Sequence, residues 1–192
     1  MFAHRKVTLA LIGAACLAAI FVLGGVYVVW RLTQATAQQA QITDPDQAAA
    51  VAQLISDYEL PPGYSLGKAF SLMGIEIAAI VPTTNPHGVT FILFQTPPGA
   101  GLSWADIEMQ LQRLYPDAFG AAQWESKEHQ NVEVRGEATT LTIQEGTDAS
   151  GALWRKAAGN FRGKSGPAGI IILGPATSWD DELIMAFLAT LQ

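Results

Sequence analysis

Four basic residues lie within ten positions of one another and form the strongest candidate for a binding surface: Arg155, Lys156, Arg162 and Lys164. They are four of the eight positive charges that follow Arg31. We predict two strands joined by a Gly-rich turn here, so the charges would gather near one end of a hairpin. Such a patch would bind anionic lipid headgroups or an acidic envelope protein. The plainer interpretation is that charges on a solvated strand maintain solubility and protect a sheet edge.

Residues 159–165, GNFRGKS, are similar to a phosphate-binding loop. That loop has the pattern G-x-x-x-x-G-K-[ST] and opens a helix whose N-terminus faces the phosphates. In this chain Ala158 stands at the position of the first glycine, and Gly166, Pro167 and a predicted strand follow the loop. We therefore expect no nucleotide to bind.

The two histidines of the C-terminal part of the chain do not complete a recognisable site. Glu125, Glu128 and His129 offer three metal ligands, but no second histidine is near, and the segment 124–131, WESKEHQN, is typical of a solvated turn. His87 lies in an NPHG turn with no nucleophile or carboxylate at a recognised spacing. We assign no catalytic, cofactor-binding or metal-binding residue. Because a triad assembles in space, a hydrolase that uses His87 or His129 remains an alternative.

Apolar periodicity predicts three helices around these residues. One follows Asp44, which is suited to cap it, and Pro45, which is suited to its first turn. Two more begin at the related sequences Ser103-Trp104-Ala105-Asp106 and Ser178-Trp179-Asp180-Asp181. In each we expect the serine to cap the helix and the last aspartate to accept a hydrogen bond from the backbone N–H of that serine.

Seven strands are predicted between these helices. Residues 89–95 and 168–173 are apolar at every position or nearly so, which indicates central strands covered on both faces. The other segments are 65–72, 75–81, 132–135, 139–144 and 153–160, of which the segments around residues 132–144 alternate between apolar and polar. Short connections favour antiparallel pairing, so we predict an α+β domain with a largely antiparallel sheet of six to seven strands and three helices.

Residues 7–30 form an uncharged apolar run of 24 residues, long enough for a helix that crosses a bilayer. Arg5 and Lys6 precede it, and after Arg31 no positive charge follows until Lys68, so the N-terminus is expected in the cytoplasm. We divide the chain into a cytoplasmic tip and transmembrane helix (1–31), a polar spacer (32–43) and an extracytoplasmic domain (44–192). The alternative is a cleaved signal peptide, with a processing site near Ala37.

The charge of the chain separates along the same boundary. Residues 1–31 carry +3, whereas residues 32–192 carry eight basic and 17 acidic residues, which gives −9. A domain this acidic is not expected to bind nucleic acid, because phosphate recognition requires clustered lysine and arginine.

The layout resembles that of bacterial single-pass membrane proteins with an uncharacterised extracytoplasmic domain. The last quarter of the chain, with the sequence IIILGPATSWDDELIMAFLATL, resembles the end of domains with the PsbP-like fold, an antiparallel sheet between helices. The resemblance implies a role in binding or assembly, since PsbP-like proteins mostly assist membrane complexes, and it assigns no functional residue. We therefore expect a tethered, non-catalytic domain that recognises a protein or envelope component. The alternatives are the small envelope hydrolase and a carrier of lipid or another small ligand.

Overall fold

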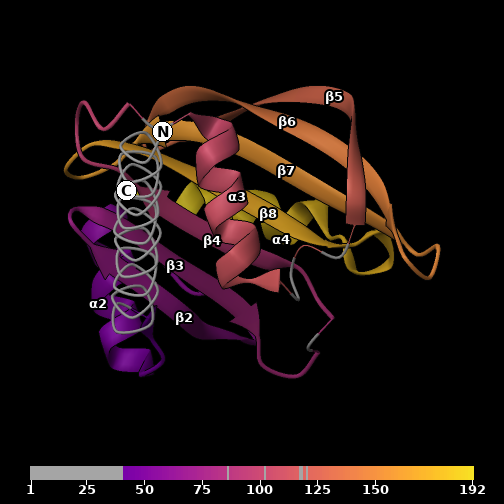
Figure 1. Cartoon of the computed structure of the whole chain (residues 1–192), viewed down its shortest axis with the longest axis horizontal. Helices are drawn as coiled ribbons and strands as arrows, with labels where there is room; N and C mark the ends of the chain where they lie inside the picture. The colour runs from indigo at the N-terminus through magenta and orange to yellow at the C-terminus, as the bar shows by residue number, and fades with distance from the viewer. Residues whose placement is uncertain (1–40, 86, 102, 117–118, 120) are drawn as a thin grey trace, which may run out of the picture. The chain divides into compact units, whose positions relative to one another are not determined.

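The computed structural model describes residues 41–85, 87–101, 103–116, 119 and 121–192. In this part of the chain, eight strands form one antiparallel sheet in the order β1-β2-β3-β4-β8-β7-β6-β5 (Figure 1). The strands are β1 (Gln41–Ile42), β2 (Tyr64–Leu72), β3 (Ile75–Pro82), β4 (Thr90–Gln95), β5 (Ala121–Val134), β6 (Glu137–Asp148), β7 (Leu153–Arg162) and β8 (Pro167–Pro175). The α+β class and the antiparallel pairing are confirmed. The additional strand is β1, which lies in the predicted spacer, so the folded unit begins at Gln41.

Three helices of this unit match the predicted ones: α2 (Pro45–Ile55), α3 (Trp104–Leu114) and α4 (Asp181–Thr190). Asp44 caps α2 by accepting the backbone N–H of Gln47 at 3.0 Å, and Ser103 and Asp106 form the predicted reciprocal cap of α3. The prediction for Ser178 is wrong. Residues Ala176–Ser178 form a short 3-10 turn, η2, and Asp180 caps α4 instead.

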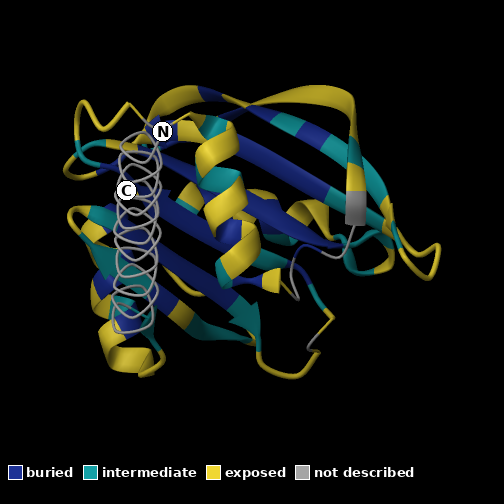
Figure 2. Ribbon diagram, viewed as in Figure 1, coloured by how far each residue is buried: buried dark blue, intermediate teal, exposed yellow. Residues whose placement is uncertain are grey.

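The helices cover both faces of the sheet. Ile55 of α2 and Phe187 and Leu188 of α4 pack on one face, whereas Leu111 of α3 packs on the other. Strands β4 and β8 lie side by side in the middle and are buried along nearly their whole length (Figure 2). The prediction of two central, doubly covered strands is confirmed. The core forms on both sides of β4 and β8.

The prediction of a solvated turn at residues 124–131 is wrong, because these residues belong to the long edge strand β5. From Gln123 to Asn131 every side chain except that of Trp124 is exposed, so the polar and apolar residues do not alternate. The segment pairs with β6 through its backbone, with register shifts after Ala121 and after Ser126. A strand at the sheet edge that is solvated on both faces carries no period-two signal in its sequence.

The described helices of residues 41–192 are all too short or too polar to cross a membrane. The predicted membrane-spanning segment, residues 7–30, lies outside the described residues.

Several turns gather at one end of the sheet, the left edge in Figure 1. They are the Met73–Gly74 turn, residues 96–101 after β4, residues 163–166 between β7 and β8, and the Arg135–Gly136 turn between β5 and β6. The chain also enters the folded unit there, because Gln41 of β1 pairs with Phe70 near the end of β2. We call this the entry end. The turn between β3 and β4, the turn at residues 149–152 and the start of α4 lie at the opposite end.

Candidate binding cleft

The four basic residues of the predicted patch do not share one surface. Arg155 and Lys156 are consecutive on β7, so their side chains project from opposite faces of the sheet. The Arg155 guanidinium lies 5.1 Å from the ring centre of Trp179, on the face of α2 and α4. Lys156 contacts Glu108 of α3 on the other face.

Arg155 is paired with two carboxylates of neighbouring strands. Its Nη2 lies 3.4 Å from Glu128 Oε1 on β5, and its Nε lies 3.6 Å from Glu145 Oε1 on β6. The positive charge of Arg155 is therefore matched locally.

Lys156 is buried, with 2% of its side chain exposed. Its ammonium group forms an ion pair with Glu108 and lies 4.8 Å from the ring centre of Trp124. Burial excludes Lys156 from any surface patch. Its contacts join α3 to strands β7 and β5 of the sheet.

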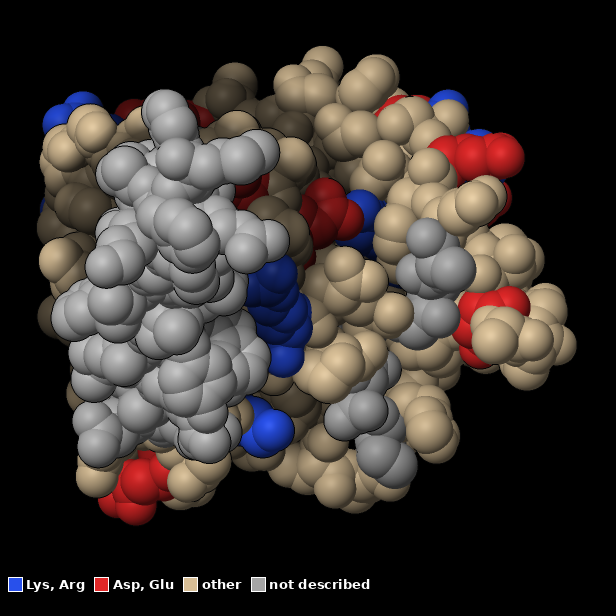
Figure 3. Space-filling view, viewed as in Figure 1, with Lys and Arg blue, Asp and Glu red and all other residues tan. Residues whose placement is uncertain are grey.

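Lys164 pairs with Asp57 at 2.6 Å, beyond the end of α2. Arg162 is exposed and has no ion-pair partner among the described residues. Acidic and basic side chains also lie next to each other on the face that carries α3 (Figure 3). The prediction grouped four basic residues into one patch. The carboxylates that pair with three of them lie 10 to 107 positions away along the chain, so the local sequence does not reveal the pairing.

The side chains of His87 and His129 are both exposed. His129 on β5 lies 3.3 Å from the Thr142 hydroxyl on β6, through Nδ1. His87 donates its backbone N–H to Asn85 Oδ1 at 3.1 Å. Among the described residues, neither ring forms a hydrogen bond with a serine or a carboxylate, so the triad that a hydrolase would require is not assembled there.

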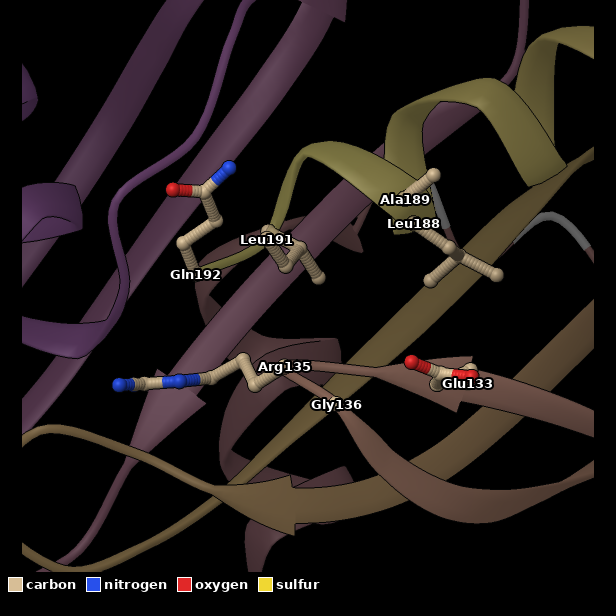
Figure 4. Close-up of a pocket in the computed structure, with 7 residues that line it drawn as sticks. All are labelled: Glu133, Arg135, Gly136, Leu188, Ala189, Leu191 and Gln192. Atoms are coloured by element: carbon tan, nitrogen blue, oxygen red, sulfur yellow. The ribbon is translucent and has the colours of Figure 1, made fainter.

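A cleft of about 580 Å³ lies between the end of α4 and the Arg135–Gly136 turn. Its volume is within the range of small-ligand and peptide-side-chain sites. Seven residues line it (Figure 4): Glu133, Arg135, Gly136, Leu188, Ala189, Leu191 and Gln192. The cleft opens at the entry end of the sheet.

The lining of the cleft combines an aliphatic wall with polar groups. Leu188 and Leu191 are 1% and 2% exposed, so they form a fixed apolar floor. Figure 4 shows the Arg135 side chain extending beneath Gln192, away from Glu133. A group that has both aliphatic and anionic parts would match this arrangement, with its anionic part near the guanidinium.

Arg135 occupies an unusual backbone conformation. Arg135 and Gly136 form a two-residue turn with φ values of 56° and 72°, a geometry in which asparagine and glycine are preferred. The left-handed region is costly for a long side chain such as arginine. Arg135 Nη1 donates to the carbonyl oxygen of Ile55 at 3.3 Å, which compensates for part of that cost.

The end of α2 is the anchor for both walls of the cleft. Ile55 O also accepts the backbone N–H of Lys164 at 3.0 Å, and Leu54 O accepts the Gln95 amide at 3.4 Å. Just beyond the helix, the backbones of Asp57 and Gln192 exchange two hydrogen bonds of 3.0 Å. These contacts satisfy the last carbonyl groups of α2, whose last turn contains no basic residue.

This cleft is not among the sites predicted from the sequence. Its lining residues come from the hairpin at residue 135 and from the chain around residue 190, so no local spacing connects them. One local signal was present, since Arg-Gly stands between two alternating segments where a tight turn would prefer Asn-Gly.

No family model matches the sequence, and no curated protein matches it. Among solved structures, the chain is similar to the solution structure of cyanobacterial PsbP (CyanoP) from Synechocystis sp. PCC 6803, with 8% sequence identity and a TM-score of 0.47. The match covers 79% of this chain and 90% of that chain. A likeness this distant concerns the fold and identifies no binding residue.

Proposed function

We propose that this protein is a membrane-tethered, non-catalytic binding domain on the outer side of the cell membrane. Residues 7–30 would form the tether, and the unit that begins at Gln41 would recognise a protein or another envelope component. The charge distribution around residues 7–30 supports the orientation, with the N-terminus in the cytoplasm.

The cleft beside α4 is the observation that carries the binding role. It joins a buried aliphatic floor to a guanidinium whose own backbone is held in a costly conformation. Conformational strain of this kind often marks a functional position. We propose that the cleft receives an aliphatic side chain or acyl segment with a neighbouring anionic group.

The same cleft favours one alternative, the carrier of a lipid or small ligand. A volume of about 580 Å³ would accommodate a small amphiphile as well as part of a peptide. Recognition of a protein predicts a protein-sized occupant of the cleft, whereas the carrier function predicts an occupant with the mass of a lipid or small ligand.

Site-specific photo-cross-linking in native membranes tests the proposal. A photoreactive amino acid replaces Glu133 at the cleft or, as the control, Thr84, which is exposed at the opposite end of the sheet. We expect one defined adduct from position 133, and we expect Arg135→Glu to reduce it strongly because the anionic group would be repelled.

The outcomes separate the candidates. A protein-sized adduct supports the assembly role, and a lipid-sized adduct supports the carrier. Equal adducts from positions 133 and 84, or an adduct that Arg135→Glu leaves unchanged, would contradict the assignment of the cleft as the binding site.

A further inference from the structure

The Met73–Gly74 turn presents an apolar side chain to solvent at a conformational cost. Met73 has a φ of 54° and is 88% exposed, the most exposed large apolar residue in the described part of the chain. Asparagine or glycine would form this turn with less strain. An apolar side chain this exposed gains free energy if an interface removes it from water, at about 25 cal/mol per Å² of apolar surface.

Two loops of the entry end form one continuous surface with this turn. A Cβ atom added to Gly74 would lie 3.4 Å from Pro97, so the turn touches the loop after β4. A Cβ atom added to Gly166 would lie 3.3 Å from Pro98, so that loop touches the turn between β7 and β8. We call residues 71–75, 96–101 and 162–167 the tip surface.

The tip surface contains two basic residues and no acidic one, and the acidic residues Glu133 and Glu137 of the same end lie outside it, beside the Arg135–Gly136 turn. The charged residues of the tip surface are Arg162, which is exposed, and Lys164, which pairs with Asp57 next to it. The opposite end of the sheet carries four acidic residues, at the end of β6 and at the start of α4: Asp148, Asp180, Asp181 and Glu182. An anionic bilayer would repel the acidic end and tolerate the tip surface.

The path of the chain leads to the same end. Gln41 lies opposite Phe70, close to Met73, and residues 31–40 connect it to the predicted tether. Ten extended residues reach at most about 35 Å. If the opposite end faced the membrane, this connection would have to run back along about six residues of β2, roughly 20 Å, whereas at the entry end it starts beside the tip surface.

We infer that the tip surface rests on the lipid bilayer, with the Met73 side chain inserted among the headgroups. The inference rests on the proposed tether and adds an orientation to it. A single methionine contributes modest apolar burial, so contact depends on the tether to hold the tip surface close. The cleft beside α4, which opens at the same end, would then lie on the membrane side of the domain.

Depth-dependent fluorescence quenching on the full chain tests this orientation. The background carries Cys16→Ala, and a single new cysteine is introduced by Met73→Cys or, as the matched control, by Thr84→Cys. Each variant is labelled with an environment-sensitive fluorophore and reconstituted into vesicles of phosphatidylcholine and phosphatidylglycerol that contain a headgroup nitroxide lipid. Both sites are exposed turn positions, so labelling should leave the fold unchanged.

We expect the label at position 73 to be quenched several-fold more strongly than the label at position 84. Equal quenching at both positions, or stronger quenching at position 84, would overturn the inference while leaving the tether intact. A chain that does not float with the vesicles at all would overturn the proposed tether and, with it, the membrane orientation. Flotation is measured before quenching, so the two failures are distinguishable.

Discussion

Lys156 of β7 and Glu108 of α3 form a largely buried ion pair that joins the helix to the sheet. Trp124 of β5 lies over the same ammonium group at 4.8 Å. Leu111 is the fully buried residue of α3, and Trp104, Ile107 and Leu114 pack around it against the sheet. The ion pair therefore adds a polar contact between α3 and the sheet to the apolar packing of the helix.

Breaking this pair should cost more than replacing it with an apolar residue. Glu108→Gln leaves the Lys156 charge buried without a counter-charge, and we expect a loss of about 3 kcal/mol in unfolding free energy. Lys156→Met removes the buried charge and keeps a similar volume, so its loss should be within about 1 kcal/mol. Urea unfolding of the full chain in detergent, followed by tryptophan fluorescence, compares the two variants. A greater loss for Lys156→Met would contradict the assignment.

The two tight turns should respond differently to substitution by asparagine. Met73→Asn relieves the left-handed strain of a side chain that makes no hydrogen bond among the described residues, so stability should rise by about 0.5–1 kcal/mol. Arg135→Asn gives the same relief but removes the hydrogen bond to Ile55, worth about 1 kcal/mol, so we expect no net gain. Thermal unfolding of both variants provides the comparison, and an equal gain for both would show that the Arg135 contact contributes nothing.

Gly163 should not tolerate a side chain. A Cβ atom there would collide with the Gln95 amide and approach Ala168 to 2.8 Å. The Gln95 amide connects Leu54 O to Ser165, so Gly163→Ala would disturb the anchor of the cleft at the end of α2. We expect a loss of about 2 kcal/mol, measured by urea unfolding. A neutral result would mean that the loop shifts freely and that Gln95 does not hold it.

Asp148 should make the folded state less stable as the pH falls. The Ser150 hydroxyl, at 2.6 Å, and then the Ala152 N–H, at 2.9 Å, bind its carboxylate and lower its pKa from 3.8 to about 2. A carboxyl group whose pKa is lower in the folded state stabilises the fold above its unfolded pKa, and this contribution is lost as pH falls through the folded value. The window therefore runs from about pH 4 to about pH 2.

The comparison with Asp148→Asn measures this effect. We expect the wild type to be the more stable protein at pH 6 and the difference in Tm to shrink steadily below pH 4. A difference that stays constant down to pH 2 would contradict the lowered pKa of Asp148.

Much of the fold could be predicted from the sequence because its strongest patterns are local. Residues 89–95 and 168–173 are apolar on both faces, and this property placed β4 and β8 at the centre of the sheet. Asp44 and the Ser103–Asp106 pair specify helix starts by hydrogen bonds within a few residues. The strand between residues 124 and 131 escaped prediction because pairing at a solvated edge depends on the neighbouring strand rather than on apolar residues.

The candidate site was less predictable because it depends on long-range contacts. Lys164 and Asp57 are 107 positions apart, and Lys156 and Glu108 are 48 apart. Because Lys156 and Lys164 each pair with a distant carboxylate, their charges are neutralised locally and do not form one basic patch. The cleft likewise joins Arg135 to Leu188 and Gln192, which only the folded chain brings together.

Labelling with a membrane-impermeant maleimide tests the central claim most directly. Thr84→Cys is placed in the Cys16→Ala background, and spheroplasts are treated with the reagent before and after lysis. A domain tethered on the outer side of the membrane predicts complete labelling of the membrane-bound protein before lysis. Labelling that appears only after lysis would place the domain in the cytoplasm and contradict the account.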